Sequence, residues 1–232
     1  MAKFANQDFQ CFEQYGRMVF QDDNGLLDLD LPSLAGRFQI DNAGLALAAI
    51  RTLNDERITT DHIASGLANV TWSARMERLE PGYLHTLVPA GTEIWLDGGH
   101  NPSAGRAVAA TLADMDERSS RPLVLVTGML NTKRADGYLG PFAGLVQKVM
   151  AIAIPGEENT IPAVELARTA IAVGLDARPY DSIEHAVRAA GEIAGGETPS
   201  RIIIGGSLYL AGNVLALHRG ETPSQVSGTA RR

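Results

Sequence analysis

The chain has 232 residues, a formal net charge of −7 at pH 7 and a single cysteine, Cys11. Its hydrophobic share of 45% and charged share of 20% are typical of a globular protein with a real core, and its length suits one domain or a domain and a half. The acidic balance argues against a nucleic-acid surface, and one cysteine allows neither an internal disulfide nor a cysteine-based metal site. The polar start and the lack of an apolar run of about 20 residues predict no signal peptide and no membrane span, so a cytoplasmic location is expected.

The first seventy residues predict a few strands followed by two helices. Residues 9–31 read as short strands and turns, and the apolar residues of Leu26 to Leu31 alternate as in a half-buried strand. Helices are predicted from about Asp41 to Leu53 and from about Thr59 to Ala68. In a purely structural interpretation, Asp41 or Asn42 caps the first of these helices.

The segment Trp72 to Leu79 follows as a linker that contains Arg75. A guanidinium group is well suited to phosphate because it presents a rigid fork of donors. The structural alternative is a solvated arginine on an edge strand.

A strand, a tight loop and a helix are predicted around Trp95 to Pro102. Thr92 to Leu96 favours a strand, Gly98 and Gly99 allow a sharp turn, and Asn101 with Pro102 favours a helix start that continues to about Met115. Such a loop lies at the carboxyl edge of a parallel sheet, where ligands bind. It would place Asp97 and His100 beside the free N–H groups of a helix N-terminus, which favour anions. The alternative is an ordinary turn that connects a strand to a helix, with a histidine that has only a structural role.

The rest of the chain alternates strands and helices, which predicts a parallel sheet with right-handed crossovers and helices on both faces. Strands are expected at residues 122–127, 148–154 and 202–204, and helices at about 136–146, 162–173, 182–194 and 207–217. Thr160 and Asp181 are plausible helix caps. No G-x-G-x-x-G follows a strand, which argues against a nicotinamide-binding domain.

Two more loops follow predicted strands. Gly128 to Lys133 ends in a lysine that could hold a carboxylate, or that is simply exposed. Gly205 to Leu210 places Ser207 at a helix start, where a hydroxyl and N–H groups suit a carboxylate; Ser207 can equally be an N-cap.

Asp97-Gly98-Gly99-His100-Asn101-Pro102 resembles the Asp-Gly-Ala-His-Asn-Pro signature of the folylpolyglutamate synthase and dihydrofolate synthase family, relatives of the Mur ligases. Four other segments resemble segments of that family and occur in the same order along the chain as in the family. They are Asn42-Ala43, Trp72 to Arg75, Gly128 to Lys133 and Gly205 to Tyr209. The similarity covers about residues 10–218. Four departures occur: Gly99 stands where Ala is usual, Phe38 stands where His is common, Ser73-Ala74 replaces Pro-Gly, and Arg134 replaces Asp.

The resemblance implies a domain organisation. Residues 1–73 would be the C-terminal tail of a Mur-ligase-type ATPase domain plus the linker. Residues 74–220 would form an α/β domain with a Rossmann-like, mostly parallel sheet and helices on both faces, and residues 221–232 a flexible tail.

The resemblance also implies roles for individual residues. Asn42, Arg75 and Asp97 would belong to the ATP side, with Asp97 holding the ribose hydroxyls or orienting Arg75. His100, Lys133 and Ser207 would orient glutamate. His100 and Asp97 are the expected catalytic residues.

The implied activity is an ATP-dependent ligase that adds L-glutamate to dihydropteroate or a folate through an acyl phosphate, with Mg²⁺. The chain has no Gly-Lys pair and therefore no P-loop, and the family's metal ligands precede the matched region. We therefore expect the chain to be the last part of a ligase, inactive alone. Its partners would be small-molecule substrates and the missing ATPase half or a second copy, with no nucleic acid and no membrane.

Two other interpretations stay open. One is a Mur-type ligase that joins a different acid and amino acid. The other is a non-catalytic module that binds an amino acid or nucleotide and docks on a separate ATPase chain. A truncated domain should expose apolar surface around residues 10–50, where its partner half is absent. The pattern does not separate dihydrofolate synthesis from polyglutamate extension.

Overall fold

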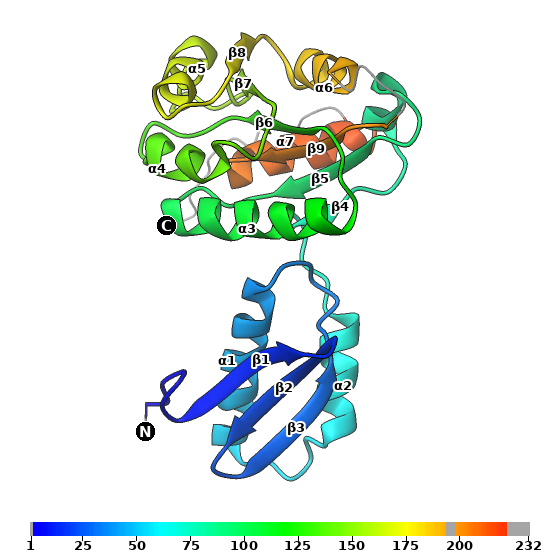
Figure 1. Ribbon diagram of the computed structural model, residues 1–232, viewed down its shortest axis with the longest axis vertical. Helices are drawn as coiled ribbons and strands as arrows, with labels where there is room; N and C mark the ends of the chain where they lie inside the picture. Colours follow the sequence, from blue (N-terminus) through cyan, green and yellow to red (C-terminus); the bar gives the residue numbers. More distant parts are fainter. Residues whose placement is uncertain (1, 194–197, 222–232) are drawn as a thin grey trace. The chain divides into compact units, whose positions relative to one another are not determined.

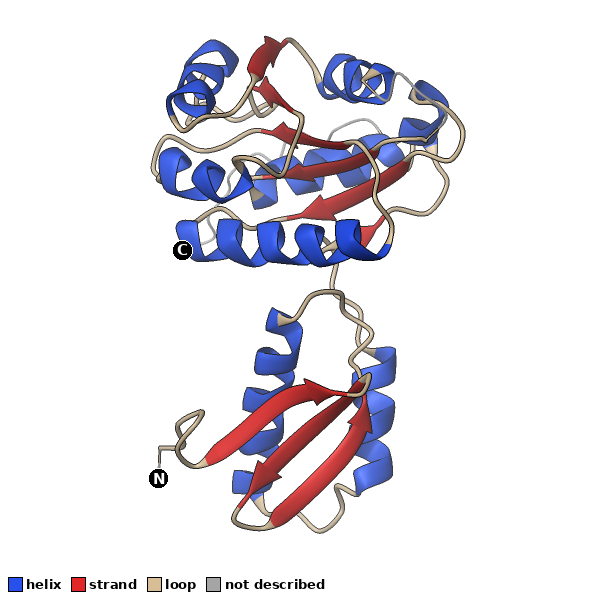
Figure 2. Cartoon of the chain, viewed as in Figure 1, coloured by secondary structure: helices blue, strands red, loops and turns tan. Residues whose placement is uncertain are grey.

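The computed structural model describes residues 2–193 and 198–221. The chain divides into two compact units, Met1–Ser73 and Ala74–Arg232, here called the N-terminal unit and the α/β unit (Figures 1 and 2). Apart from Glu221, the predicted flexible tail lies outside the described residues. No helix in the described part of the chain has both the length and the apolar character needed to cross a membrane.

The N-terminal unit is an antiparallel three-stranded sheet with two helices. Its sheet has the order β1 (Phe9–Gln14), β2 (Arg17–Asp22), β3 (Gly25–Asp30), and its helices are α1 (Phe38–Leu53) and α2 (Thr60–Asn69). Tyr15 and Gly16, both with positive φ, form the two-residue turn between β1 and β2, as a tight hairpin requires. The core of this unit combines Phe9, Met18, Phe20 and Leu29 of the strands with Ile40, Ala43, Leu47 and Ala48 of α1.

Helix α1 begins earlier than predicted. Its first residue is Phe38 and its N-cap is Arg37, so the expectation that Asp41 or Asn42 caps it is wrong. Gly36, with a φ of 111°, turns the chain just before the helix and sets its start. The predicted start of α2 is confirmed, because the Thr59 side chain accepts the backbone N–H of His62 as an N-cap.

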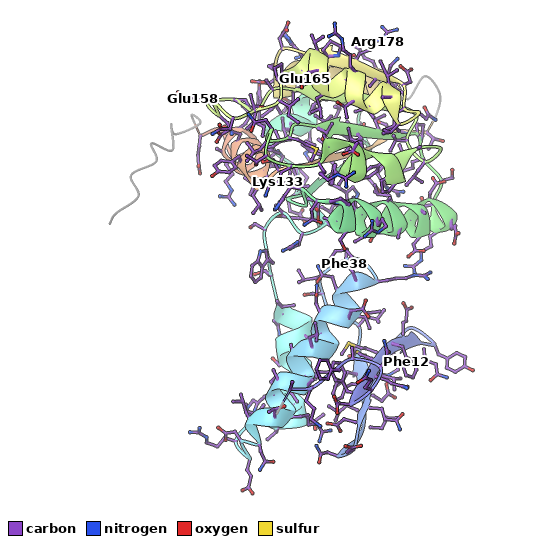
Figure 3. The ribbon with its side chains drawn as sticks, turned by 90° about the vertical axis from the view of Figure 1, so that its left-hand side faces the viewer. Phe12, Phe38, Lys133, Glu158, Glu165 and Arg178 are labelled. Carbon is purple, nitrogen blue, oxygen red and sulfur yellow. The ribbon has the colours of Figure 1, made fainter. Side chains whose placement is uncertain are left out.

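Large apolar side chains are exposed in the N-terminal unit, as expected for residues 10–50. Leu45 and Leu53 of α1 are 53% and 70% exposed, and Phe12 of β1, labelled in Figure 3, is 40% exposed. Leu45 and Leu53 lie on the opposite face of α1 from the buried Leu47 and Ala48. Helix α1 therefore has one face packed on the sheet of the N-terminal unit and an apolar stripe that the described residues of this unit leave exposed.

The α/β unit is built on a six-stranded, mostly parallel sheet, which confirms the predicted fold class. The strand order is β4 (Glu77–Arg78), β5 (Glu93–Asp97), β9 (Arg201–Gly205), β6 (Leu123–Thr127), β7 (Lys148–Ile152) and β8 (Ala177–Tyr180). Only β4 runs antiparallel to its neighbour. Of the two edge strands, β4 was expected only in the structural alternative that placed Arg75 on an edge strand, and β8 was not predicted. One has only two residues and the other contains Arg178 and Pro179, so neither shows the apolar run of a buried strand.

Helices cover both faces of this sheet (Figure 1). On one face lie α3 (Pro102–Arg118), α4 (Ala135–Leu139) and α5 (Ala163–Ala172), with a short 3₁₀ helix, η2 (Gly140–Phe142). On the other lie α6 (Ile183–Glu192), α7 (Leu208–His218) and the 3₁₀ helix η1 (Tyr83–Leu87). Residues Val124, Val126, Ile202 and Ile204 of the central strands share a buried core with Ala186, Val187 and Val214 of α6 and α7.

Three predicted helix features are corrected. The helix expected at residues 136–146 is only the short α4 followed by η2, because Pro141 cannot continue an α-helix. Thr160 does not cap α5; its hydroxyl accepts the backbone N–H of Ile154 instead. Asp181 does not cap α6, because Ser182 does so by accepting the N–H of His185.

Candidate functional site

Three loops of the α/β unit leave the sheet from one row of residues. In the register of the central strands, Asp97 of β5 and Thr127 of β6 both lie beside Gly205 of β9. Because these strands are parallel, the loops that follow them start at the same carboxyl edge, where ligands bind in open α/β sheets. The three loops that the sequence singled out are therefore neighbours.

Asp97 is buried at this edge, with 2% of its surface exposed. Its Oδ1 accepts the backbone N–H of Gly99 at 2.7 Å, and its Oδ2 accepts the backbone N–H of Met76 at 3.0 Å. Burial raises the pKa of the Asp97 carboxyl, while the two N–H groups and the charge of Arg75 limit that rise. Both carboxylate oxygens are thus already engaged with the protein backbone.

The two glycines after Asp97 lie in crowded positions. A Cβ at Gly98 would collide with the side chain of Leu208, at the start of α7. A Cβ at Gly99 would lie 2.7 Å from both Asp97 Oδ1 and Ala104 Cβ, so this backbone suits glycine where the resembled signature has alanine. The loop after β5 is therefore packed directly against the start of α7.

His100 follows these glycines and is half-buried. Its Nδ1 lies 3.2 Å from the carbonyl oxygen of Gly98, which can only accept, so Nδ1 carries a hydrogen. In the neutral ring this leaves Nε2 as the nitrogen that can accept a proton or a hydrogen bond. Asn101 caps α3 by accepting the N–H of Ala104 at 2.9 Å, and Pro102 opens the helix, as predicted.

Arg75 lies at the start of the α/β unit, in a turn with an uncommon backbone. Ala74 and Met76, on either side, have φ values of 56° and 42° and are buried, whereas Arg75 is exposed. Residues other than glycine adopt such left-handed conformations rarely. This explains why the resembled pattern has glycine at the position of Ala74.

The turn around Arg75 is tied to the loop after β5. Gly98 donates its backbone N–H to the carbonyl of Ala74 at 2.8 Å, and Ala74 donates its own N–H to Glu77 Oε2 at 2.7 Å. With the bond from Met76 to Asp97, this places Arg75, Asp97 and His100 in one connected segment. Glu77 was not singled out from the sequence, where an acidic residue between Met76 and Arg78 carries no signal of this contact.

The remaining two predicted residues of the α/β unit belong to the loops after β6 and β9. Lys133 is exposed on the loop after β6 (Figure 3). Arg134 next to it forms an ion pair with Asp136 in the first turn of α4 at 2.9 Å, so an acidic group still lies beside this loop. Ser207 is buried and its Oγ accepts the N–H of Tyr209 at 3.1 Å, which confirms that it caps α7.

Asn42 belongs to the N-terminal unit and is exposed on α1. Its Nδ2 donates to Oε1 of Gln39, one turn earlier, at 2.9 Å. Gln39 is 4% exposed, so a buried side chain orients the Asn42 amide. Gln39 is a second residue whose contribution the sequence did not indicate.

Two buried hydroxyl groups lie beneath the carboxyl edge. Thr127 Oγ1 and Tyr138 Oη are fully buried and have no hydrogen-bond partner among the described residues. Tyr138 Oη would lie 2.7 Å from a Cβ at Gly205, and Thr127 Oγ1 would lie 2.6 Å from a Cβ at Gly206. Burial, and then the charge of Asp97, raises the pKa of Tyr138. Both positions require glycine because the hydroxyls occupy the space.

No group of three or more His, Cys, Asp or Glu side chains suited to a metal ion occurs within residues 2–193 and 198–221.

Comparison with known proteins places this site in a family. The family described as "Mur ligase, glutamate ligase domain" matches residues 75–208, from Arg75 to the residue after Ser207. The folylpolyglutamate synthase of Lacticaseibacillus casei is 27% identical over 203 residues, covering 85% of this chain and 42% of that protein. The dihydrofolate synthase/folylpolyglutamate synthase of Mycobacterium tuberculosis is 32% identical over 127 residues, covering 53% of this chain and 24% of that protein.

Solved structures agree in fold. The Mycobacterium tuberculosis folylpolyglutamate synthase complexed with ADP has a TM-score of 0.74 at 25% identity, and Escherichia coli FolC in complex with DHPP and ADP has a TM-score of 0.75 at 20% identity. Each comparison covers 92% of this chain but only 48% and 46% of those chains, so the chain spans about half the length of these relatives. Because the matched domain covers more than half of the chain and holds the whole carboxyl-edge site, the chain belongs to the Mur ligase family through its glutamate ligase domain.

Proposed function

We propose that this chain supplies the C-terminal part of an ATP-dependent ligase that joins L-glutamate to dihydropteroate or a folate. The observation that carries the proposal is the single row of Asp97, Gly205 and Thr127, which brings three family-like loops to one edge of the sheet. Similarity to relatives named folylpolyglutamate synthase and dihydrofolate synthase supports the choice of substrates.

The proposed reaction has two steps. The pterin-linked carboxylate attacks the γ-phosphorus of ATP, which gives an acyl phosphate and releases ADP. The α-amino group of glutamate then attacks the acyl carbon, forming the amide and releasing phosphate and a proton. Phosphoryl transfer depends chiefly on positioning and charge neutralisation, to which a guanidinium such as that of Arg75 contributes.

On the ATP side, the proposed residues are Asn42, Arg75 and Asp97. The Asn42 amide donates one N–H to Gln39 and keeps its oxygen and second N–H for a nucleotide base. Asp97 has both oxygens engaged with backbone N–H groups, so its contacts favour orienting Arg75 over holding the ribose.

On the glutamate side, the proposed residues are His100, Lys133 and Ser207. The free N–H groups at the start of α7 and the Lys133 ammonium suit carboxylates, and His100 Nε2 suits the amino group or its proton. His100 is proposed as a catalytic residue, whereas Asp97, whose two oxygens hold backbone N–H groups, is proposed to act through the residues that it positions.

A divalent cation, Mg²⁺, is part of the proposal because it neutralises phosphate charge. One related structure, that of the Yersinia pestis bifunctional synthase, is complexed with AMPPNP and Mn ion. We propose that the metal ligands belong to the part of the relatives that has no counterpart in this chain, since the described residues hold no metal cluster.

The first experiment measures steady-state kinetics of the complete ligase that carries this chain. Arg75→Ala should raise the KM for ATP or lower kcat by at least tenfold, and His100→Ala should raise the KM for glutamate, as expected when about 1.4 kcal/mol or more of binding is lost. Arg178→Ala, at an exposed position of β8, is the matched control and should leave both constants unchanged. If the KM for ATP and kcat are both unchanged in Arg75→Ala, the proposed role of Arg75 in ATP binding is wrong.

A second experiment concerns the chain by itself. Without a Gly-Lys phosphate loop, the chain should incorporate no glutamate when given ATP and dihydropteroate. Addition of the separately produced P-loop part should restore incorporation. Glutamate incorporation by the chain alone would contradict the proposal that the reaction needs the P-loop part.

The missing phosphate loop also keeps a second function open, a non-catalytic module that binds an amino acid or a nucleotide. Calorimetric titration of the chain with glutamate and with ATP distinguishes this function. Micromolar binding of either ligand, with no gain of activity on adding a P-loop ATPase, would favour the binding module. A substrate panel on the complete enzyme distinguishes folate ligation from a Mur-type reaction with another acid.

A further inference from the structure

We propose that Glu77 and Asp97 are positioning residues that clamp the turn on both sides of Arg75 and so present its guanidinium in a fixed direction. The inference rests on the proposed role of Arg75 in phosphate binding and adds Glu77, which neither the sequence nor the family match had indicated.

The backbone of the turn is the first observation. Ala74 and Met76 both have positive φ, at 56° and 42°. Left-handed residues that are not glycine persist only where surrounding contacts hold them, and they gather at functional sites. Two such residues flank a single exposed arginine here, so the contacts that hold them fix the backbone from which the Arg75 side chain extends.

Two hydrogen bonds to the loop after β5 supply part of that hold. The peptide between Ala74 and Arg75 is fixed by the Gly98 N–H, which donates to the Ala74 carbonyl at 2.8 Å. The peptide between Arg75 and Met76 is fixed by Asp97 Oδ2, which accepts the Met76 N–H at 3.0 Å. Both peptide units beside Arg75 are therefore tied to the loop after β5.

Glu77 closes the other side of the turn. Its Oε2 accepts the N–H of Ala74 at 2.7 Å, and its backbone pairs with Leu96 of β5 in the antiparallel register of β4. The carboxylate thus reaches back three residues from a strand that is part of the sheet. Removing it frees the N-terminal end of the turn while Asp97 still holds the C-terminal end.

Side-chain burial completes the clamp. Ala74 and Met76 are 4% and 2% exposed, and Arg75 between them is exposed. Only the arginine side chain is left to meet a ligand. A backbone held in this way loses less conformational freedom when Arg75 binds a ligand, so the clamp should act on affinity for the phosphates and hardly on the amide-forming step.

The test uses the complete ligase with Glu77→Ala, Glu77→Gln and Glu165→Ala. Glu77→Ala should raise the KM for ATP about tenfold with kcat and the KM for glutamate nearly unchanged. Glu77→Gln should stay close to the parent enzyme, because an amide oxygen still accepts the Ala74 N–H. Glu165→Ala, at an exposed position of α5, is the control and should have no effect (Figure 3).

Asp97→Asn should differ from Glu77→Ala in a specific way. Asp97 holds Met76 and also Gly99, next to His100, and an asparagine side chain can accept only one of these two N–H groups. Asp97→Asn should therefore raise the KM values for both ATP and glutamate. An effect of Glu77→Ala on the glutamate KM as large as on the ATP KM would overturn the proposal.

A double-mutant cycle shows whether Glu77 acts through Arg75. In an Arg75→Ala background, Glu77→Ala should cause no further change in the ATP KM. A full additional tenfold loss would mean that Glu77 acts independently, and the positioning role would be rejected.

Amide hydrogen exchange of this chain tests the clamp separately from the reaction. Glu77→Ala should speed exchange of the Ala74 amide at least tenfold, and Glu77→Gln should not. If Arg75→Ala leaves ATP kinetics unchanged while exchange responds as expected, the proposed role of Arg75 is wrong and the clamp stands. If exchange at Ala74 does not respond to Glu77→Ala, the clamp is wrong.

Discussion

Met76 donates its backbone N–H to the Asp97 carboxylate at 3.0 Å, across 21 residues of chain. This bond joins the first turn of the α/β unit to the end of β5, where the family-like motif begins. The second oxygen of the same carboxylate holds Gly99. One buried acid thus fixes the backbone beside Arg75 and the backbone beside His100.

Ala74→Gly should raise the free energy of unfolding of the α/β unit by about 1 kcal/mol, because glycine adopts the φ of 56° without steric strain. Ala110→Gly, at an exposed position inside α3, is the contrasting control and should lower that free energy by about 0.5–1 kcal/mol. Urea unfolding of both variants measures the difference. A destabilised Ala74→Gly would show that the turn is not left-handed in solution.

Asp97 should make stability fall as pH rises from acid values. Burial raises its pKa in the folded chain, so above the ordinary pKa of an aspartate the folded state binds more protons than the unfolded state. Its contribution to stability is therefore greatest at low pH and is lost as pH rises through the raised pKa. Comparing urea unfolding of the parent chain and Asp97→Asn from about pH 4 to about pH 7 isolates this contribution. Parallel pH profiles would contradict it.

His85 should make stability fall as pH decreases from neutral values, which is the opposite of the effect of Asp97. Burial lowers its pKa in the folded chain, the nearby His218 and Arg78 lower it further, and Glu80 opposes them. The unfolded state then binds more protons, so stability is present at neutral pH and is lost as pH falls through the ordinary histidine pKa of about 6.5.

The surroundings of His85 explain why its protonated form is disfavoured in the folded chain. Its ring lies 5.4 Å from that of His218, whose Nε2–H donates to the carbonyl of Glu80 at 2.8 Å. The Nδ1 atoms of both rings are buried without a partner among the described residues. His85→Gln should therefore reduce the loss of melting temperature between about pH 7.5 and about pH 5.5, whereas His185→Gln, at an exposed position, should not.

The uncovered stripe of α1 should cause self-association of the chain when it is produced alone. Replacing the exposed Leu45 and Leu53 with Glu should shift the chain towards monomer without loss of melting temperature, because neither side chain contributes to the core. Sedimentation velocity measures the change. Leu47→Glu, at a buried position of the same helix, should unfold the N-terminal unit. A parent chain that is monomeric at all concentrations would contradict the prediction.

Much of the α/β unit could be predicted because its central strands are apolar runs. Leu123–Thr127, Lys148–Ile152 and Arg201–Gly205 show the pattern of strands that are buried on both faces, and each is followed by a helical segment. The edge strands Glu77–Arg78 and Ala177–Tyr180 lack it, because only part of their surface meets the core.

Individual site residues could be predicted where a local pattern exists. Asn101 and Ser207 were recognisable as helix caps because the cap and the N–H that it accepts lie within three residues. The contacts of Asp97 and Glu77 had no such pattern. They are made to backbone N–H groups, which every residue except proline has, and the positive φ of Ala74 and Met76 is unusual for those residue types.

The boundary between the two compact units has a consequence for recombination of this gene with those of its relatives. Every contact of the clamp lies within residues 74–98, on the α/β side of Ser73. A crossover at Ser73 would transfer Arg75 from the same parent as the residues that hold its turn, which are Glu77, Asp97 and Gly98. A crossover only a few residues later, between Glu77 and Asp97, would combine an arginine from one parent with the anchoring loop of another.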